Sequence, residues 1–194
     1  MAKHIPSNIY RSGKLCGDYR ETHVDQSATI SGWVHNYRDL GGILFIDLRD
    51  RSGIIQVVFD PNRSGDEVHR IAGSLRREDV VTVSGKIGRR SAETVNPSMP
   101  TGLVELEAMT VTLLSRAKTP PFDIDDAIDT SEDTRLKYRY IDIRRPEMQT
   151  ALETRARAVS AARRYLDDNG FIEVETPFFG KSTQIGRASC RERV

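Results

Sequence analysis

The sequence has little cysteine, no long apolar run and almost no net charge, and the first two shortages each exclude a class of protein. Cys16 and Cys190, the two cysteines, lie far apart and outside any paired motif, so we expect neither a disulfide framework nor a metal site. Residues 1–13 lack the apolar run of a signal peptide or membrane anchor. No uncharged stretch reaches the roughly 20 residues of a membrane helix. We therefore expect a soluble, cytoplasmic protein with no membrane partner.

The formal charge of +1 conceals a local excess of basic residues. Between Arg135 and Arg164 there are nine Arg or Lys residues and three Asp or Glu residues. Such a run is typical of a solvated helix face, and it is also what a phosphate backbone attracts. Charge alone leaves both interpretations open.

Three short strands follow one another between Ala28 and Asp60. Apolar residues alternate with polar ones along 29–36, 42–49 and 54–59, which indicates strands with one buried face. The expected inward residues are Ile30, Gly32, Val34, Leu44, Ile46, Leu48, Ile55, Val57 and Phe59. The other face carries Phe45, Gln56 and charges, which are suited to stacking a base and recognising its edge. The alternative is that Phe45 belongs to a second, minor core.

The following segments complete a small barrel. Glycines in 36–42 predict a turn, apolar spacing predicts a helix over 64–77, and alternation predicts strands over 80–87 and 103–112, with a mobile polar loop over 89–102 between them. Three strands, a helix and two strands is the order of a five-stranded OB barrel, whose second and third strands commonly bind oligonucleotides. An unrelated β-barrel or a half-sandwich fits the same strand order.

A long helix and a short strand follow a connector over 115–134. The helix is expected from Pro146, a favourable first position, to about Asp168, where Asn169–Gly170 ends it. The strand is expected over 171–175. Their apolar faces must pack on a missing remainder of the protein, on a partner subunit, or on both.

Three segments carry a resemblance to a known family: GWVHNYRDLGGILFIDLRDRSGIIQVVFD (32–60), RLKYRYIDIRRPEMQ (135–149) and GFIEVETP (170–177). Over about residues 10–183 the chain resembles the N-terminal part of bacterial-type aspartyl-tRNA synthetases. The last segment is similar to motif 1 of class II synthetases, with Pro177 as its proline. Lysyl and asparaginyl enzymes share the OB module, but YRYIDIRRPEM is more similar to the aspartyl group.

The resemblance implies an all-β OB-fold barrel of five strands and one helix, followed by the start of an α+β class II catalytic domain. The expected divisions are a lead-in (1–27), an anticodon-binding domain (28–114), a hinge (115–134), the start of the catalytic domain (135–183) and a tail (184–194). The parent protein would activate aspartate with ATP and Mg²⁺, transfer it to tRNA, and form a homodimer through motif 1 and Pro177. This fragment is expected to contain no catalytic residue, to bind no cofactor and to be inactive. The alternative function is a stand-alone OB-fold module for single-stranded nucleic acid.

Four residues match the family's anticodon contacts. Phe45 matches the aromatic that stacks on the central uracil, and Gln56 matches the amide that hydrogen-bonds this base. Arg38, in the expected turn, matches a basic residue at the anticodon, and Glu105 matches a carboxylate near the first anticodon base. Alternation places Phe45, Gln56 and Glu105 on outward phases of their strands. Leu40 stands where members of relaxed tRNA specificity carry histidine, which favours a discriminating enzyme.

The resemblance ends after Thr183. One nucleotide sequence that encodes Gln184–Val194 is identical, from its second base onward, to a common short-read sequencing adapter. Our hypothesis is that this tail is translated adapter, and the alternative is a genuine divergent terminus. Cys190, Arg187 and Arg191 then carry no functional meaning.

Overall fold

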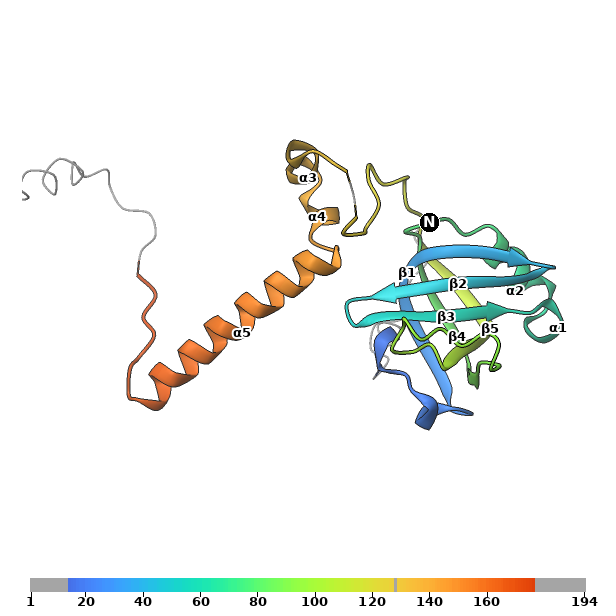
Figure 1. Ribbon diagram of the computed structural model, residues 1–194, viewed down its shortest axis with the longest axis horizontal. Helices are drawn as coiled ribbons and strands as arrows, with labels where there is room; N and C mark the ends of the chain where they lie inside the picture. Colours follow the sequence, from blue (N-terminus) through green and yellow to red (C-terminus); the bar gives the residue numbers. More distant parts are fainter. Residues whose placement is uncertain (1–13, 128, 177–194) are drawn as a thin grey trace, which may run out of the picture. The chain divides into compact units, whose positions relative to one another are not determined.

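The computed structural model (Figure 1) describes residues 14–127 and 129–176, and the chain divides into two units, Met1–Pro146 and Glu147–Val194. In the described part of the first unit, five strands form a closed barrel in the order β1-β2-β3-β5-β4. The strands are β1 (Ser27–Leu40), β2 (Ile43–Asp50), β3 (Gly53–Phe59), β4 (Val80–Arg89) and β5 (Val104–Ser115). The β3–β5 pair is parallel, and β1 closes the barrel on β4. The predicted OB topology is confirmed, and the half-sandwich is excluded.

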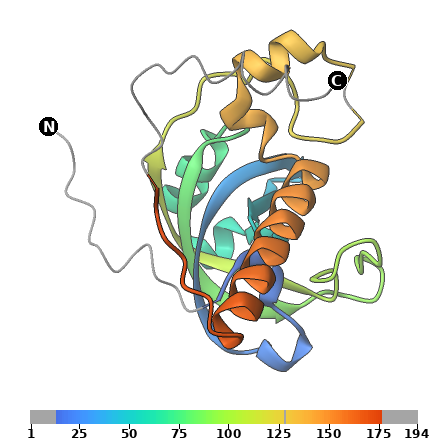
Figure 2. The ribbon, with the colours of Figure 1, turned by 90° about the vertical axis from the view of Figure 1, so that its left-hand side faces the viewer.

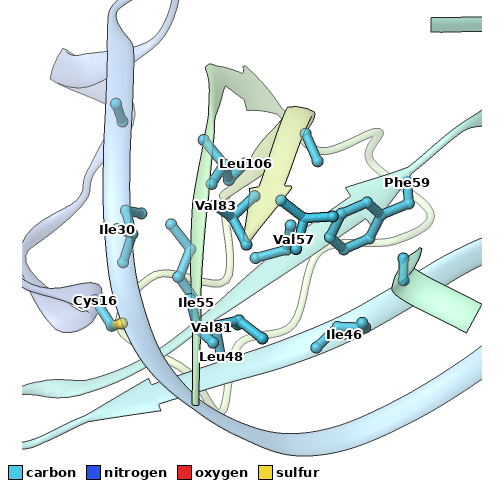
Figure 3. Close-up of a cluster of buried hydrophobic side chains, with 14 of the residues drawn as sticks. Cys16, Ile30, Ile46, Leu48, Ile55, Val57, Phe59, Val81, Val83 and Leu106 are labelled. Atoms are coloured by element: carbon cyan, nitrogen blue, oxygen red, sulfur yellow. The ribbon is translucent and has the colours of Figure 1, made fainter. Parts of the chain in front are cut away.

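The barrel interior is filled by the residues that alternation assigned to it. Fully buried side chains come from all five strands: Ile30, Val34, Leu44, Ile46, Leu48, Ile55, Val57, Phe59, Val81, Val83, Ile87 and Leu106. Figure 3 shows part of this cluster. Because a closed sheet has only one inner face, each strand contributes every second residue to a single core. The outer face is thereby left to polar and aromatic side chains.

The prediction of a turn over 36–42 was wrong for most of its length. β1 continues to Leu40, and Asn36 to Leu40 pair with Ile43 to Asp47 on β2. Only Gly41 and Gly42 form the turn, with φ of +63° and +87°. Two successive positive φ angles are what a two-residue hairpin turn requires, and glycine adopts them without steric cost. β1 also has a bulge between Val34 and Asn36, and the strand bends around the barrel (Figure 2).

The predicted helix over 64–77 is shorter and broken. α1 (Pro61–Ser64) and α2 (Asp66–Gly73) are separated by Gly65, whose φ is +81°. The apolar face was predicted correctly: Ala72 and Leu75 are buried in the core, and Val68 and Ile71 pack against it.

The lead-in before β1 also contributes to the core, which its sequence did not indicate. It contains two 3₁₀ helices, Cys16–Asp18 and Glu21–His23. Cys16 and Tyr19 are buried among the barrel residues, and the Cys16 N–H donates to Asp50 at 2.7 Å.

Beyond β5, two short helices that were not predicted, α3 (Glu132–Lys137) and α4 (Arg139–Asp142), precede α5 (Pro146–Asp168). A small second cluster contains Phe122, Ile124 and Ile141, with Tyr138 against it. α5 has its predicted bounds, and Gly170, with φ of +81°, follows it as expected. None of the described helices is long and apolar enough to cross a membrane.

The strand predicted over 171–175 does not form. The structure assigns no regular structure to residues 171–176, and Phe171, Ile172 and Val174 are exposed. A strand needs a neighbour to accept its backbone hydrogen bonds, and within the described residues no strand pairs with this segment. Alternation alone did not reveal that this partner is lacking.

Candidate nucleic-acid interface

The four predicted contact residues come together on the outer face of the barrel. Strand register places Arg38 opposite Phe45, and Phe45 opposite Val58 on β3. Gln56 lies one row along β3, opposite Asp47 on β2. Arg38 was expected in a turn and instead belongs to β1, which fixes its position beside β2. Three neighbouring strands thus present one continuous row of side chains.

Phe45 lies outside the core. Its ring is half-buried, and it lines a pocket of about 370 Å³ together with Gln56 and Glu105. Val58 and Thr94 also line this pocket. A ring that is partly accessible in a pocket of this size is positioned to stack with a planar ligand. Arg38 is not part of this lining, and it approaches from the neighbouring strand.

Gln56 is the centre of a hydrogen-bond network. Its Nε2 donates to Glu105 Oε2 at 3.0 Å, and its Oε1 accepts from Arg38 Nη2 at 3.2 Å and also from Arg90 Nη2. Arg38 donates in addition to Asp47 Oδ1 at 3.4 Å. The predicted outward direction of Gln56 is confirmed, but the residue is only 4% exposed, because these neighbours surround its amide.

Glu105 has an unusual environment for a carboxylate. Burial raises its pKa above the ordinary value, while the positive charge of Arg90 and the hydrogen bond from Gln56 oppose this shift. The carboxyl group therefore takes up a proton at a higher pH than an exposed glutamate does. Its position between an amide and a guanidinium holds it at one wall of the pocket.

Two site residues were missed by sequence reasoning. Arg90 lies directly after β4 and is buried against Gln56 and Glu105. Every second residue of β4 points outward, as Lys86 and Gly88 do. Extending this alternation by two residues would have placed Arg90 on the same face. Arg63 of α1 also lines the pocket, and its Nη1 lies 2.7 Å from Glu107 Oε2. No signal in the sequence linked Arg63 to β5.

Pro177, the predicted interface residue of motif 1, lies outside the described residues, as does the tail 184–194. Within residues 14–127 and 129–176, no three His, Cys, Asp or Glu side chains are grouped to hold a metal ion. The side chains on this face offer stacking, hydrogen bonding and charge.

A second polar cluster lies where β1 and β2 come close to the start of β4. Arg49 makes two hydrogen bonds to Glu78, at 2.9 and 3.0 Å, and its Nη1 lies 2.9 Å from His35 Nδ1. Arg144 lies over the Trp33 ring at 4.7 Å and 3.7 Å from Glu78. This cluster joins the barrel to the segment that carries α4.

The His35 ring is expected to make stability depend on pH. Because arginine can only donate, Nδ1 must accept and the ring must be neutral. Burial is the largest cause that lowers the pKa of His35 below 6.5, and the charges of Arg49 and Arg77 lower it further. The unfolded chain takes up this proton near pH 6.5, so the stability contributed by neutral His35 is present above that pH and is lost as the pH falls below it. Melting temperatures between pH 7.5 and 5.5 should therefore fall more steeply for the natural chain than for His35→Gln, and parallel curves would contradict the assignment.

Comparison with known families and proteins identifies the barrel as an OB domain and relates the chain to a synthetase family. The family described as "OB-fold nucleic acid binding domain" matches residues 28–114, and the family "tRNA synthetases class II (D, K and N)" matches residues 131–190. The "Aspartate--tRNA ligase" of Bacillus licheniformis is 51% identical over 172 residues, which is 88% of this chain and 29% of that protein. The "Aspartate--tRNA(Asp/Asn) ligase" of Anoxybacillus flavithermus is 50% identical over 171 residues, with 88% and 29% covered. The chain thus spans less than a third of the length of these relatives.

Solved structures share the fold. The aspartyl-tRNA synthetase of Entamoeba histolytica has a TM-score of 0.76 at 18% identity, over 96% of this chain and 45% of that one. The asparaginyl-tRNA synthetase of Pyrococcus horikoshii has a TM-score of 0.73 at 24% identity, over 86% and 36% of the two chains. At these identities the likeness concerns the fold alone.

Proposed function

The chain is a homologue of the N-terminal part of bacterial aspartate–tRNA ligases, with an OB-fold domain followed by the start of a class II synthetase domain, and on this premise we propose that its barrel binds the anticodon loop of an aspartate tRNA. The observation that carries the proposal is the meeting of Phe45, Gln56 and Glu105 in one pocket. Aromatic rings that stack unpaired bases, with amides and carboxylates at their edges, are the usual means of recognising single-stranded RNA.

Each residue has a distinct part in the proposed complex. The Phe45 ring stacks on the central uracil, and the Gln56 amide bonds the edge of the same base. Glu105 lies beside the first anticodon base, where a carboxylate can accept hydrogen bonds from it. Arg38 is 53% exposed in its side chain and already contacts Gln56, so it can reach a phosphate or base without rearrangement of the strand.

The whole protein is proposed to activate aspartate with ATP and Mg²⁺ and to transfer it to its tRNA in the cytoplasm. The described residues contain no group that fits a metal ion, so no step through ATP or Mg²⁺ is assigned to them. The apolar residues of α5, among them Leu152, Val159 and Leu166, are exposed in this chain. We assign them, with Pro177, to the homodimer interface of the whole protein.

The proposal is tested by replacing Phe45 with alanine and measuring binding of a labelled anticodon hairpin by fluorescence anisotropy. Loss of one base stack costs about 1–3 kcal/mol, which corresponds to a dissociation constant about 5–150 times higher. Phe45→Tyr keeps the ring and should bind like the natural chain. Undiminished binding by Phe45→Ala would contradict the stacking role.

The same assay separates the alternative of a general single-strand binder. An anticodon-binding domain should prefer the aspartate hairpin over poly-dT of equal length, while a general OB module should bind both equally. Both ligands are titrated at one stated salt concentration, because binding to phosphates weakens steeply with salt.

A further inference from the structure

Arg90 is a buried guanidinium beneath the candidate interface. Its side chain is 5% exposed, and it follows directly after β4. Nη2 donates to Gln56 Oε1, Nη1 donates to the Gly102 carbonyl at 3.4 Å, and Nε lies 3.5 Å from Glu105 Oε2. A single side chain thus touches both the amide and the carboxylate that line the pocket.

These contacts permit only one orientation of the Gln56 amide. Guanidinium groups can only donate and an ionised carboxylate can only accept. The amide oxygen must therefore face Arg38 and Arg90, and the amide nitrogen must face Glu105. The reversed amide would place its N–H groups against two guanidinium groups and its oxygen against a carboxylate.

This orientation decides what Gln56 offers to a base. Both lone pairs of Oε1 are occupied by arginine donors, whereas Nε2 has two N–H bonds and uses one of them for Glu105. The group that remains is a hydrogen-bond donor. Uracil has a carbonyl oxygen at position 4, and cytosine has an amino group there. A fixed donor can hydrogen-bond to O4 of uracil. It cannot do so to the amino group of cytosine, which is itself a donor.

We propose that Arg90 is a positioning residue that holds the Gln56 amide as a donor and thereby makes the site select uracil over cytosine at the central anticodon position. This inference rests on the proposed function, because it assumes that an anticodon base reaches Gln56. Arg38 supports the same orientation, but it is half-exposed and shared with Asp47. Arg90 is buried, so water does not replace its contacts, and its Nε also lies 3.5 Å from Glu105 Oε2. Arg90 therefore does more than Arg38 to fix the orientation of the Gln56 amide.

The test compares affinities for two anticodon hairpins that differ only in uracil or cytosine at the central position. The natural chain should prefer uracil, and in Arg90→Lys this preference should fall at least fivefold, because lysine keeps the charge but cannot hold Gln56 and Glu105 with one rigid fork. Arg49→Lys is the matched control. Arg49 is likewise a largely buried arginine paired with a glutamate, so Arg49→Lys should lose stability but keep the uracil preference.

A second variant keeps the test decisive if Arg90→Lys fails to fold. Gln56→Glu replaces the donor with an acceptor of the same shape, and its preference should shift towards cytosine. Retained uracil preference in a folded Arg90→Lys, or in Gln56→Glu, would overturn the inference. A natural chain that binds both hairpins equally, together with a Phe45→Ala variant that binds normally, would instead overturn the proposed function itself.

Discussion

Replacing Phe59 with alanine is expected to lower the free energy of unfolding by about 3–5 kcal/mol, the usual cost of removing a buried aromatic ring. Phe59 is 0% exposed and has the largest side chain among the fully buried residues. It lies opposite Leu44 in the strand register and inside the barrel (Figure 3). A closed barrel cannot collapse easily around the missing ring, because its strands are hydrogen-bonded on both sides.

The measurement is urea unfolding of the full chain, with equal slopes required so that the midpoints report stability alone. Phe59→Leu, which keeps an apolar side chain of similar volume, should cost less than about 1.5 kcal/mol. Phe45→Ala is the informative contrast, because this ring is half-buried on the outer face. It should reduce RNA affinity much more than stability. A loss below about 1 kcal/mol for Phe59→Ala, which is the typical effect of any substitution, would contradict the packing described.

The difference between these two phenylalanines is predictable from the sequence because strand alternation has only two phases. Once Leu44, Ile46 and Leu48 are assigned inward, Phe45 must point outward, and the structure places it outside the core. The same logic placed Gln56 and Glu105 outward and brought three candidate residues to one face. For this part of the site, local pattern was sufficient.

Alternation could not predict which outward residues are covered. Gln56 points outward and is nevertheless buried, because Arg38, Arg90 and Glu105 surround its amide. These partners are 18, 34 and 49 positions away along the chain. Contacts of this kind depend on the closure of the barrel, and no short window of sequence contains them.

The ends of the strands could not be predicted from local sequence either. The turn predicted from the glycines included Asn36 to Leu40, yet these residues extend β1, because β2 supplies a register partner for each of them. The opposite error occurred over 171–175, where a good strand pattern has no partner in the described residues. Both errors follow from the same fact: backbone hydrogen bonds to a neighbour decide whether an extended segment is a strand.

Asp79 shows how a buried charge can be inconspicuous in a sequence and important in the fold. Its side chain is 0% exposed and accepts three hydrogen bonds: from the Arg76 N–H at 2.8 Å, from Arg116 Nη1 at 2.7 Å and from the Ala117 N–H at 2.8 Å. It thereby ties the start of β4 to the segment that leaves β5. That segment leads to α3 and α4, so Asp79 secures the exit of the chain from the barrel.

Asp79→Ala is expected to destabilise the chain by about 2–4 kcal/mol, since each backbone donor left without a partner costs about 1–3 kcal/mol and both lie only partly buried. Arg116→Gln is the matched control, because Arg116 is 42% exposed and its removal leaves both backbone hydrogen bonds to Asp79 intact. This control should cost less than Asp79→Ala, because the Asp79 carboxylate keeps both backbone donors when the half-exposed Arg116 is replaced. Urea unfolding of both variants measures the difference. Equal losses would mean that the ion pair, and not the hydrogen bonds to two backbone amides, is what Asp79 contributes.

Hydrogen exchange at the Ala117 amide provides an independent measurement. Exchange should accelerate in Asp79→Ala and remain slow in Arg116→Gln, because only the first change removes the acceptor of that N–H.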